Sequence, residues 1–383
     1  MTFKILSLDG GGIRGVVSAT LLQEVEKIIT AHDPGKTLHE YFDLITGTST
    51  GSILAAGIVC QRSATELVNL YQKRGREIFL ESVRQERDCP LYYLAQLPIP
   101  ELFVPFKQFL PSTSGQGYGL YPNMDPTQGL RHVLQNELRY QGKHPKIGEL
   151  QGQDTNLLIL AYDVYSRNTT WFSNDPEAWF KDLPLWQVCA ASAAAPTFFP
   201  PITLPYKGRS LPHIDGGVSA NNPTLSAIAH ALWIHPTLET RDIAILSIGT
   251  GHTTKAYPSE EVENWGLLNW ATNISNIFID PGAKNSEDIG RQILNSIESP
   301  YLRLDFDLNI RSQQGQVQRQ YNKYLYQKTG GQYKVKINES IDDPGACPQL
   351  VKATNAYIDI ATVDYMGEKL SICGAIERFI CDN

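Results

Sequence analysis

The chain has 383 residues, 42% of them hydrophobic, and its 33 lysines and arginines against 40 aspartates and glutamates give a formal charge of −7. A protein of this length and composition can bury a sizeable core, and its negative balance disfavours nucleic acid or a strongly anionic membrane as a partner. No run approaches the ~18 apolar residues of a membrane span, and the amino end gives no secretory signal. The six cysteines form no C-x-x-C pair and have no metal-ligand spacing to histidine, so we expect free thiols and a soluble, cytoplasmic protein.

The first 60 residues repeat a strand, turn and helix pattern. An apolar run at residues 3–8 predicts a strand, and residues 16–29 follow with apolar side chains at helical spacing. A second strand is predicted at residues 41–46, and a second helix with many small side chains at residues 52–60. This alternation predicts a parallel sheet with helices on its faces.

The composition changes after the next predicted helix, at residues 64–80. Residues 89–126 are rich in proline, glycine and aromatic side chains. This stretch predicts a long loop, which is either a functional lid or a packed excursion over a sheet edge. The remaining strands are predicted at residues 157–164 (with 169–173 returning antiparallel), 213–215, 243–248 and 301–306, and the remaining helices at 186–195, 223–233, 260–279, 286–297, 349–360 and 369–379.

The second predicted turn carries a candidate nucleophile. It reads Gly47-Thr48-Ser49-Thr50-Gly51, which matches the G-x-S-x-G pattern of a nucleophile elbow. In such an elbow the serine occupies a strained turn where only small neighbours fit, and the following helix N-terminus favours negative charge. The pattern is short enough to arise by chance, but the predicted strand before it and helix after it favour Ser49 as a nucleophile.

The first predicted turn reads Asp9-Gly10-Gly11-Gly12-Ile13-Arg14-Gly15. Its backbone amides can donate to an oxyanion, and losing one such donor costs ~3 kcal/mol of transition-state stabilisation. The same string matches the G-x-G-x-x-G fingerprint of dinucleotide sites, although Asp9 would place a carboxylate beside the pyrophosphate. Arg14 lies in the first helical turn, where a cation is disfavoured. It either attracts an anionic group or has the structural role that we favour, orienting the loop or pairing with Asp9.

A third string, Asp215-Gly216-Gly217, ends a predicted strand and offers a carboxylate base. A solvated aspartate is a weak base for a hydroxyl, but burial raises its basicity. The alternative is a turn aspartate that caps the glycines. A triad would require a histidine, and the candidates are His213, His230, His235 and His252. None of them lies in a motif-like setting, so we favour a Ser49–Asp215 dyad.

Together these residues resemble the patatin-like phospholipases, and the likeness covers most of the chain. The glycine loop, the elbow and the Asp-Gly-Gly string each match a family motif, as do residues 191–201, 246–251 and 260–270. The resemblance implies an α/β fold with a central, largely parallel sheet flanked by helices on both sides. It also implies that Ser49 is the nucleophile and Asp215 the base. The oxyanion hole that it implies comprises Gly10, Gly11, Gly12, Arg14 and Gly15.

By the same resemblance the activity is hydrolysis of fatty-acyl esters in phospholipids, lysophospholipids or galactolipids, through an acyl-serine intermediate and without a metal or other cofactor. The implied partners are the lipid substrate and, transiently, a membrane surface. We expect one domain over residues 1–383, with a catalytic core at about 1–255 and a helical part at about 256–383. Two alternatives remain open: a catalytically silent binding or storage protein on the same scaffold, and a nucleotide-binding oxidoreductase that uses the glycine loop.

Overall fold

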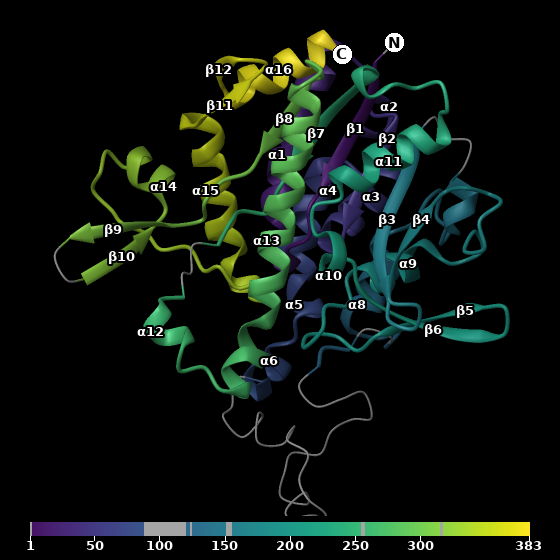
Figure 1. Cartoon of the computed structure of the whole chain (residues 1–383), viewed down its shortest axis with the longest axis horizontal. Coiled ribbons are helices and arrows are strands. Elements are labelled where there is room, and N and C mark those ends of the chain that lie inside the picture. Colours follow the sequence, from purple (N-terminus) through teal and green to yellow (C-terminus); the bar gives the residue numbers. More distant parts are fainter. Residues whose placement is uncertain (1, 88–119, 123–124, 151–154, 254–256, 315–316) are drawn as a thin grey trace, which may run out of the picture.

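The computed structural model describes residues 2–87, 120–122, 125–150, 155–253, 257–314 and 317–383. Within these residues one eight-stranded sheet has the order β5-β6-β3-β2-β1-β7-β8, and β4 pairs with β3 outside this path (Figure 1). The strands of the sheet are β1 (Phe3–Leu8), β2 (Leu44–Thr48), β3 (Asn156–Asp163), β4 (Asn168–Ser173), β5 (Ile202–Tyr206), β6 (Arg209–Asp215), β7 (Ile243–Ile248) and β8 (Tyr301–Leu304).

The middle of the sheet is parallel, as predicted. Strands β3, β2, β1, β7 and β8 run the same way, whereas β4 and β6 run antiparallel to β3, and β5 runs antiparallel to β6. Leu8 pairs with Gly47, and Ala161 of β3 pairs with Asp215. The turn after β1, the turn after β2 and the end of β6 therefore meet at one edge of the sheet.

Helices cover both faces of the sheet. The α-helices of the described residues are α1 (Gly15–His32), α2 (Leu38–Tyr41), α3 (Thr50–Val59), α4 (Ala64–Asn69), α5 (Gly75–Ile78), α6 (Glu81–Arg87), α8 (Gly129–Glu137), α9 (Leu185–Ser192), α10 (Gly217–Ala220), α11 (Thr224–Ile234), α12 (Ser259–Val262), α13 (Leu267–Asn295), α14 (Lys323–Lys328), α15 (Cys347–Ile360) and α16 (Ile372–Asp382). Among the described residues no helix is long and apolar enough to cross a membrane.

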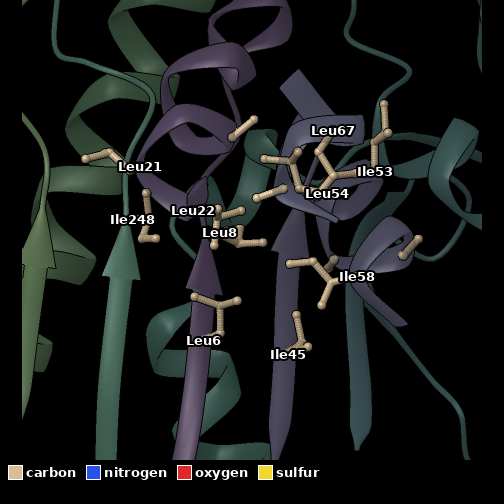
Figure 2. Packing of buried hydrophobic residues seen from close by; sticks show 14 of the residues in the cluster. Leu6, Leu8, Leu21, Leu22, Ile45, Ile53, Leu54, Ile58, Leu67 and Ile248 are labelled. Carbon is tan, nitrogen blue, oxygen red and sulfur yellow. The ribbon is translucent and has the colours of Figure 1, made fainter. Parts of the chain in front are cut away.

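Alternate side chains of β1 enter two separate cores, as the two-residue period of a strand requires. Leu6 and Leu8 pack with α1, α3 and α4 on one face, and Figure 2 shows Leu8 beside Leu22. Ile5 belongs to a smaller core on the other face, which α11 and α13 cover (Figure 1). The sheet is therefore the middle layer of an α/β/α fold.

Several predicted elements differ from the structure. Tyr41 ends the short helix α2 instead of opening β2, because Thr37 and Glu40 form a capping box at its start. The helices predicted at 260–279 and 286–297 are replaced by α12 and by the single helix α13, which continues through Pro281. Pro281 is exposed, and it lacks the N–H that would donate to a carbonyl one turn earlier in α13.

The carboxyl-terminal part of the chain contains strands as well as helices. The helix predicted at 369–379 begins only at Ile372, where Ser371 caps α16, and the residues before it form β12 (Glu368–Ser371), paired with β11 (Thr362–Tyr365). A second hairpin joins β9 (Ile310–Gln314) and β10 (Val317–Tyr321). The part after residue 255 is thus not purely helical, and it adds β8 to the central sheet. Most of the loop predicted at 89–126 lies outside the described residues.

Candidate active site

Ser49 lies in a strained turn between β2 and α3. Its backbone has φ 54° and ψ −122°, which is unusual for a residue with a side chain. The turn passes close to the end of β1, since a Cβ on Gly51 would lie 2.1 Å from the Leu8 carbonyl oxygen. This close contact with β1 explains why the motif has a glycine at position 51. The turn also puts Ser49 at the N-terminus of the ten-residue helix α3, where its dipole favours negative charge.

Asp215 lies within hydrogen-bonding distance of this serine. The Ser49 Oγ donates to Asp215 Oδ2 at 2.6 Å, across 166 positions of sequence. Oδ1 of the same carboxylate accepts the Gly217 amide at 2.7 Å, so Asp215 also caps the turn, while Oδ2 remains bonded to the serine. Ser49 is 7% exposed and Asp215 3% exposed. Burial raises the pKa of Asp215 to about 6, against the opposing effect of its hydrogen bonds, and so makes it a stronger base.

The histidines considered for a triad have other partners. His213 is buried, and its ring nitrogens contact the Thr170 hydroxyl at 2.9 Å and the Leu211 carbonyl at 3.1 Å. His230 packs against Trp171 and Trp233, and burial lowers its pKa to about 4. His235 packs on Phe3, and His252 lies 3.1 Å from Asp305. This arrangement favours a dyad.

Ser192, near the C-terminal end of α9, holds both members of the pair. Its hydroxyl accepts the Ser49 amide at 2.9 Å and donates to the Leu160 carbonyl at 2.6 Å. Its own carbonyl accepts the Gly216 amide at 3.1 Å, beside Asp215. The stretch around Ser192 resembles a family motif, but the sequence assigns this residue no role. The feature of the sequence that could have pointed to Ser192 is its place as a polar residue among alanines.

Only part of the glycine loop lines the cavity beside Ser49. Gly11, Gly12 and Arg14 line the same cavity as Ser49 and Asp215, whereas Gly10 and Gly15 do not. The Gly10 amide donates to the Asn221 carbonyl at 3.0 Å, and the amides of Arg14 and Gly15 donate back to the loop itself. Three of the five predicted oxyanion residues thus use their amides within the protein. The amides of Gly11 and Gly12 are the remaining candidates.

Gly12 is required by its conformation. Its φ is +59°, and a Cβ there would lie 2.1 Å from the Ile341 carbonyl oxygen. That same carbonyl accepts the Ile13 amide at 2.7 Å. A segment more than 300 residues away in sequence therefore supports the loop, which local pattern analysis did not anticipate.

Arg14 is buried beside the cavity, but the expectation that it pairs with Asp9 is wrong. The Asp9 carboxylate is paired with Arg303 of β8 instead, at 2.6 Å. Arg14 and Asp9 lie on opposite sides of three glycines, and Asp9 faces the part of the sheet that β7 and β8 form. Proximity in sequence suggested the wrong cation.

The cavity beside Ser49 is mostly apolar. Its polar side chains, besides Ser49 and Asp215, are those of Arg14, Thr50, Tyr71 and Asn221. No group of three or more histidine, cysteine, aspartate or glutamate side chains in the described part of the chain could hold a metal ion. The apolar lining comes from distant elements and comprises Ile13, Ile53, Ile78, Phe79, Leu130, Ala193, Ala195, Phe198, Phe199 and Ile341.

Comparison with known proteins identifies the family of this chain. The family model described as patatin-like phospholipase matches residues 6–228. Patatin-like protein 4 of Arabidopsis thaliana is 30% identical over 79% of this chain and 76% of its own length. Patatin-like protein 2 of the same plant is 30% identical over 79% and 75%, and patatin group J-1 of Solanum tuberosum is 28% identical over 70% and 66%. The chain therefore belongs to the patatin-like phospholipase family, whose members are lipid acyl hydrolases.

Proposed function

We propose that this enzyme cleaves fatty-acyl esters of phospholipids, lysophospholipids or galactolipids through a Ser49–Asp215 dyad. The observation that carries the proposal is the 2.6 Å hydrogen bond from Ser49 Oγ to a buried carboxylate of raised basicity. A hydroxyl is a poor nucleophile until a base within this reach accepts its proton. The dyad supplies that base without a histidine.

The first half of the reaction forms an acyl-serine. As Asp215 Oδ2 accepts the proton, Ser49 Oγ attacks the acyl carbonyl carbon and the carbonyl electrons move onto its oxygen. The amides of Gly11 and Gly12 donate to this oxyanion, assisted by the N-terminus of α3. The intermediate then collapses, and the leaving alcohol takes the proton from Asp215.

The second half releases the fatty acid. Asp215 accepts a proton from water, whose oxygen attacks the acyl-serine carbonyl. A second oxyanion forms in the same position and collapses, and Ser49 leaves with the proton that Asp215 had taken. The carboxylate and the hydroxyl are thereby restored. No step requires a group beyond these side chains, amides and water.

The surroundings of the dyad also suit a lipid substrate. The apolar wall formed by Ile53, Phe79, Leu130 and Phe199 suits a fatty-acyl chain. We expect transient contact with a membrane surface, where such substrates reside, and a cytoplasmic location for the protein. We also propose that residues 1–383 act as one domain, because β8 completes the sheet to which the dyad is attached.

Two substitutions test the dyad on a fatty ester. Ser49→Ala and Asp215→Asn are each expected to lower kcat by about 10³-fold or more with an unchanged fold. Asp163→Asn is a matched control, because Asp163 is also a buried aspartate at a strand end that accepts the amide two residues later. Its activity should stay within about twofold of the parent.

Labelling with a fluorophosphonate provides a second readout. The parent and Asp163→Asn should be modified at Ser49, and Ser49→Ala should not. Full turnover by Ser49→Ala would overturn the proposal. A parent protein that neither hydrolyses esters nor takes the label would instead indicate a catalytically silent binding protein.

A further inference from the structure

We propose that Arg303 is a positioning residue for the glycine loop: by holding Asp9, it sets where the amides of Gly11 and Gly12 point. The inference deepens the proposed function and rests on it. Arg303 lies in β8, outside residues 6–228 that the family model matches. In the sheet β7 lies between β1 and β8, so Arg303 reaches Asp9, at the end of β1, across β7.

Arg303 holds Asp9 with both ends of its guanidinium group. Nη1 donates to Asp9 Oδ1 at 3.0 Å, and Nη2 donates to Oδ2 at 2.6 Å. Nη1 also donates to the Ser247 hydroxyl of β7 at 2.9 Å. A bidentate pair of this kind restricts rotation as well as distance, so the carboxylate of Asp9 has one favoured orientation. Both partners are at least 95% buried, which leaves little competition from water.

Further carboxylates hold the guanidinium in place. Nη2 also donates to Asp305 Oδ2 at 2.8 Å, and Nε lies 3.6 Å from Glu287 Oε2 of α13. Glu287 is itself bonded to Arg291 at 2.7 Å. Among the described residues, Glu287 has ion pairs with Arg303, Arg291 and Lys284 and none with the glycine loop, so it affects the loop only through Arg303. Arg303 thus stays anchored when the charge of Asp9 is removed.

Asp9 is the last residue before three consecutive glycines, which have wide conformational freedom. Oxyanion donors must be held within about 0.5 Å of their working position. The loop achieves this through anchors outside itself. Besides the Arg303 pair, the Thr250 hydroxyl donates to the Gly10 carbonyl at 3.0 Å, and the Ile13 amide donates to the Ile341 carbonyl at 2.7 Å. Of these anchors, the Arg303 pair is the only one made by two oppositely charged side chains.

Asp9→Asn is the variant that tests the inference. It keeps the shape of the side chain, and Arg303 retains Asp305 and Glu287. We expect kcat on a fatty ester to fall about 10- to 100-fold, with KM within twofold, because the donors move while the apolar cavity does not. Glu287→Gln is the matched control: it also removes one buried carboxylate from Arg303, and its kcat should stay within about twofold. Similar melting temperatures for both variants would exclude a difference in stability as the cause.

Binding of two inhibitors separates positioning from a structural role. An acyl trifluoromethyl ketone adds to the Ser49 hydroxyl and creates an oxyanion, whereas the ether of the same chain length only occupies the cavity. Asp9→Asn should weaken the ketone about as much as it lowers kcat and leave ether binding unchanged. Glu287→Gln should leave both affinities unchanged.

The outcomes distinguish the two levels of proposal. If Asp9→Asn binds the ketone as tightly as the parent, or if both variants lose the same kcat, Arg303 has no positioning role while the dyad stands. If the parent gives no Ser49-dependent ketone complex, the proposed function itself fails.

Discussion

The elbow and the glycine loop face each other across one cavity, but they are held in place by different parts of the chain. The elbow is held by short-range geometry and by Ser192, all within the region that the family model matches. The loop is also held from within that region by Asn221, but its other supports, Arg303, Thr250 and Ile341, lie beyond it. The proposed nucleophile and the proposed oxyanion donors therefore have different supports.

The elbow and the glycine loop differ because each must be kept from a different conformational change. The Ser49 turn is strained, so its support must keep an unfavourable conformation from relaxing. The glycine loop has the opposite problem, because glycines permit many conformations and the loop must be limited to one. Hydrogen bonds to the backbone suit the first task. A charged pair and a close carbonyl contact suit the second.

The largest effect that would sharpen this comparison is expected from Gly12→Ala. A Cβ at this position would lie 2.1 Å from the Ile341 carbonyl and would oppose a φ of +59°, so the donor must move. We expect kcat to fall about 10²- to 10³-fold, as when an oxyanion donor is lost. Gly142→Ala is the control, since Gly142 has φ +76° and a Cβ there would meet no atom within 4 Å. Equal activity of the two variants would mean that the loop tolerates displacement.

The pH dependence of kcat/KM tests the elbow and the glycine loop together, because each has a buried aspartate beside it. Burial raises the pKa of Asp215, and also that of Asp9 despite the Arg303 charge, to about 6. Because the base must be ionised, kcat/KM on an uncharged ester should fall about tenfold per pH unit below about 6. Protonating a carboxyl whose folded-state pKa is raised stabilises the folded state, so titration of Asp215 does not unfold the protein and activity should return at pH 7.

Asp9→Asn assigns this acid limb. The variant lacks one of the two titrating carboxyls, so the fall that remains reports on Asp215. An activity that stays constant down to pH 5 in the parent would contradict the role of Asp215 as the base.

Ser192→Ala is expected to have a smaller effect on the elbow side. It leaves the Ser49 amide and the Leu160 carbonyl without this hydroxyl, at a cost of about 1–3 kcal/mol in stability. We expect kcat to fall about tenfold because the strained turn relaxes. Ser18→Ala is the control, since the Ser18 hydroxyl is equally buried and donates to the Gly249 carbonyl at 2.7 Å. Should Ser18→Ala lose as much activity, the effect would be general destabilisation.

The smallest effect is expected from Thr250→Val on the loop side. The substitution keeps the shape of the side chain but removes the 3.0 Å hydrogen bond to the Gly10 carbonyl. Since Asp9 and Ile13 still anchor the loop, kcat should fall only about twofold, with about 1 kcal/mol lost in stability measured by urea unfolding. A loss larger than that of Asp9→Asn would show that Thr250, not Arg303, is the main anchor.

Much of the site could be predicted because its motifs are local. The alternation of apolar runs and glycine turns predicted β1, β2 and the helices that follow them, and Gly47 and Gly51 marked the elbow. Boundaries failed where local capping or an exposed proline decided the outcome, as at Tyr41 and Pro281. The local sequence pattern does not indicate which distant carbonyl or hydroxyl forms a hydrogen bond with a given amide.

The strand–turn–helix units around Gly12 and Ser49 could thus be predicted from the sequence, because steric limits at a tight turn act on adjacent residues. The partners of those turns were not. Asp9 meets Arg303, 294 positions away, and not the nearby Arg14, and the Gly10 amide meets Asn221 and not an oxyanion. In a buried site, charges and donors pair with whichever groups share the same water-free space, and folding brings those groups together irrespective of their separation in the chain.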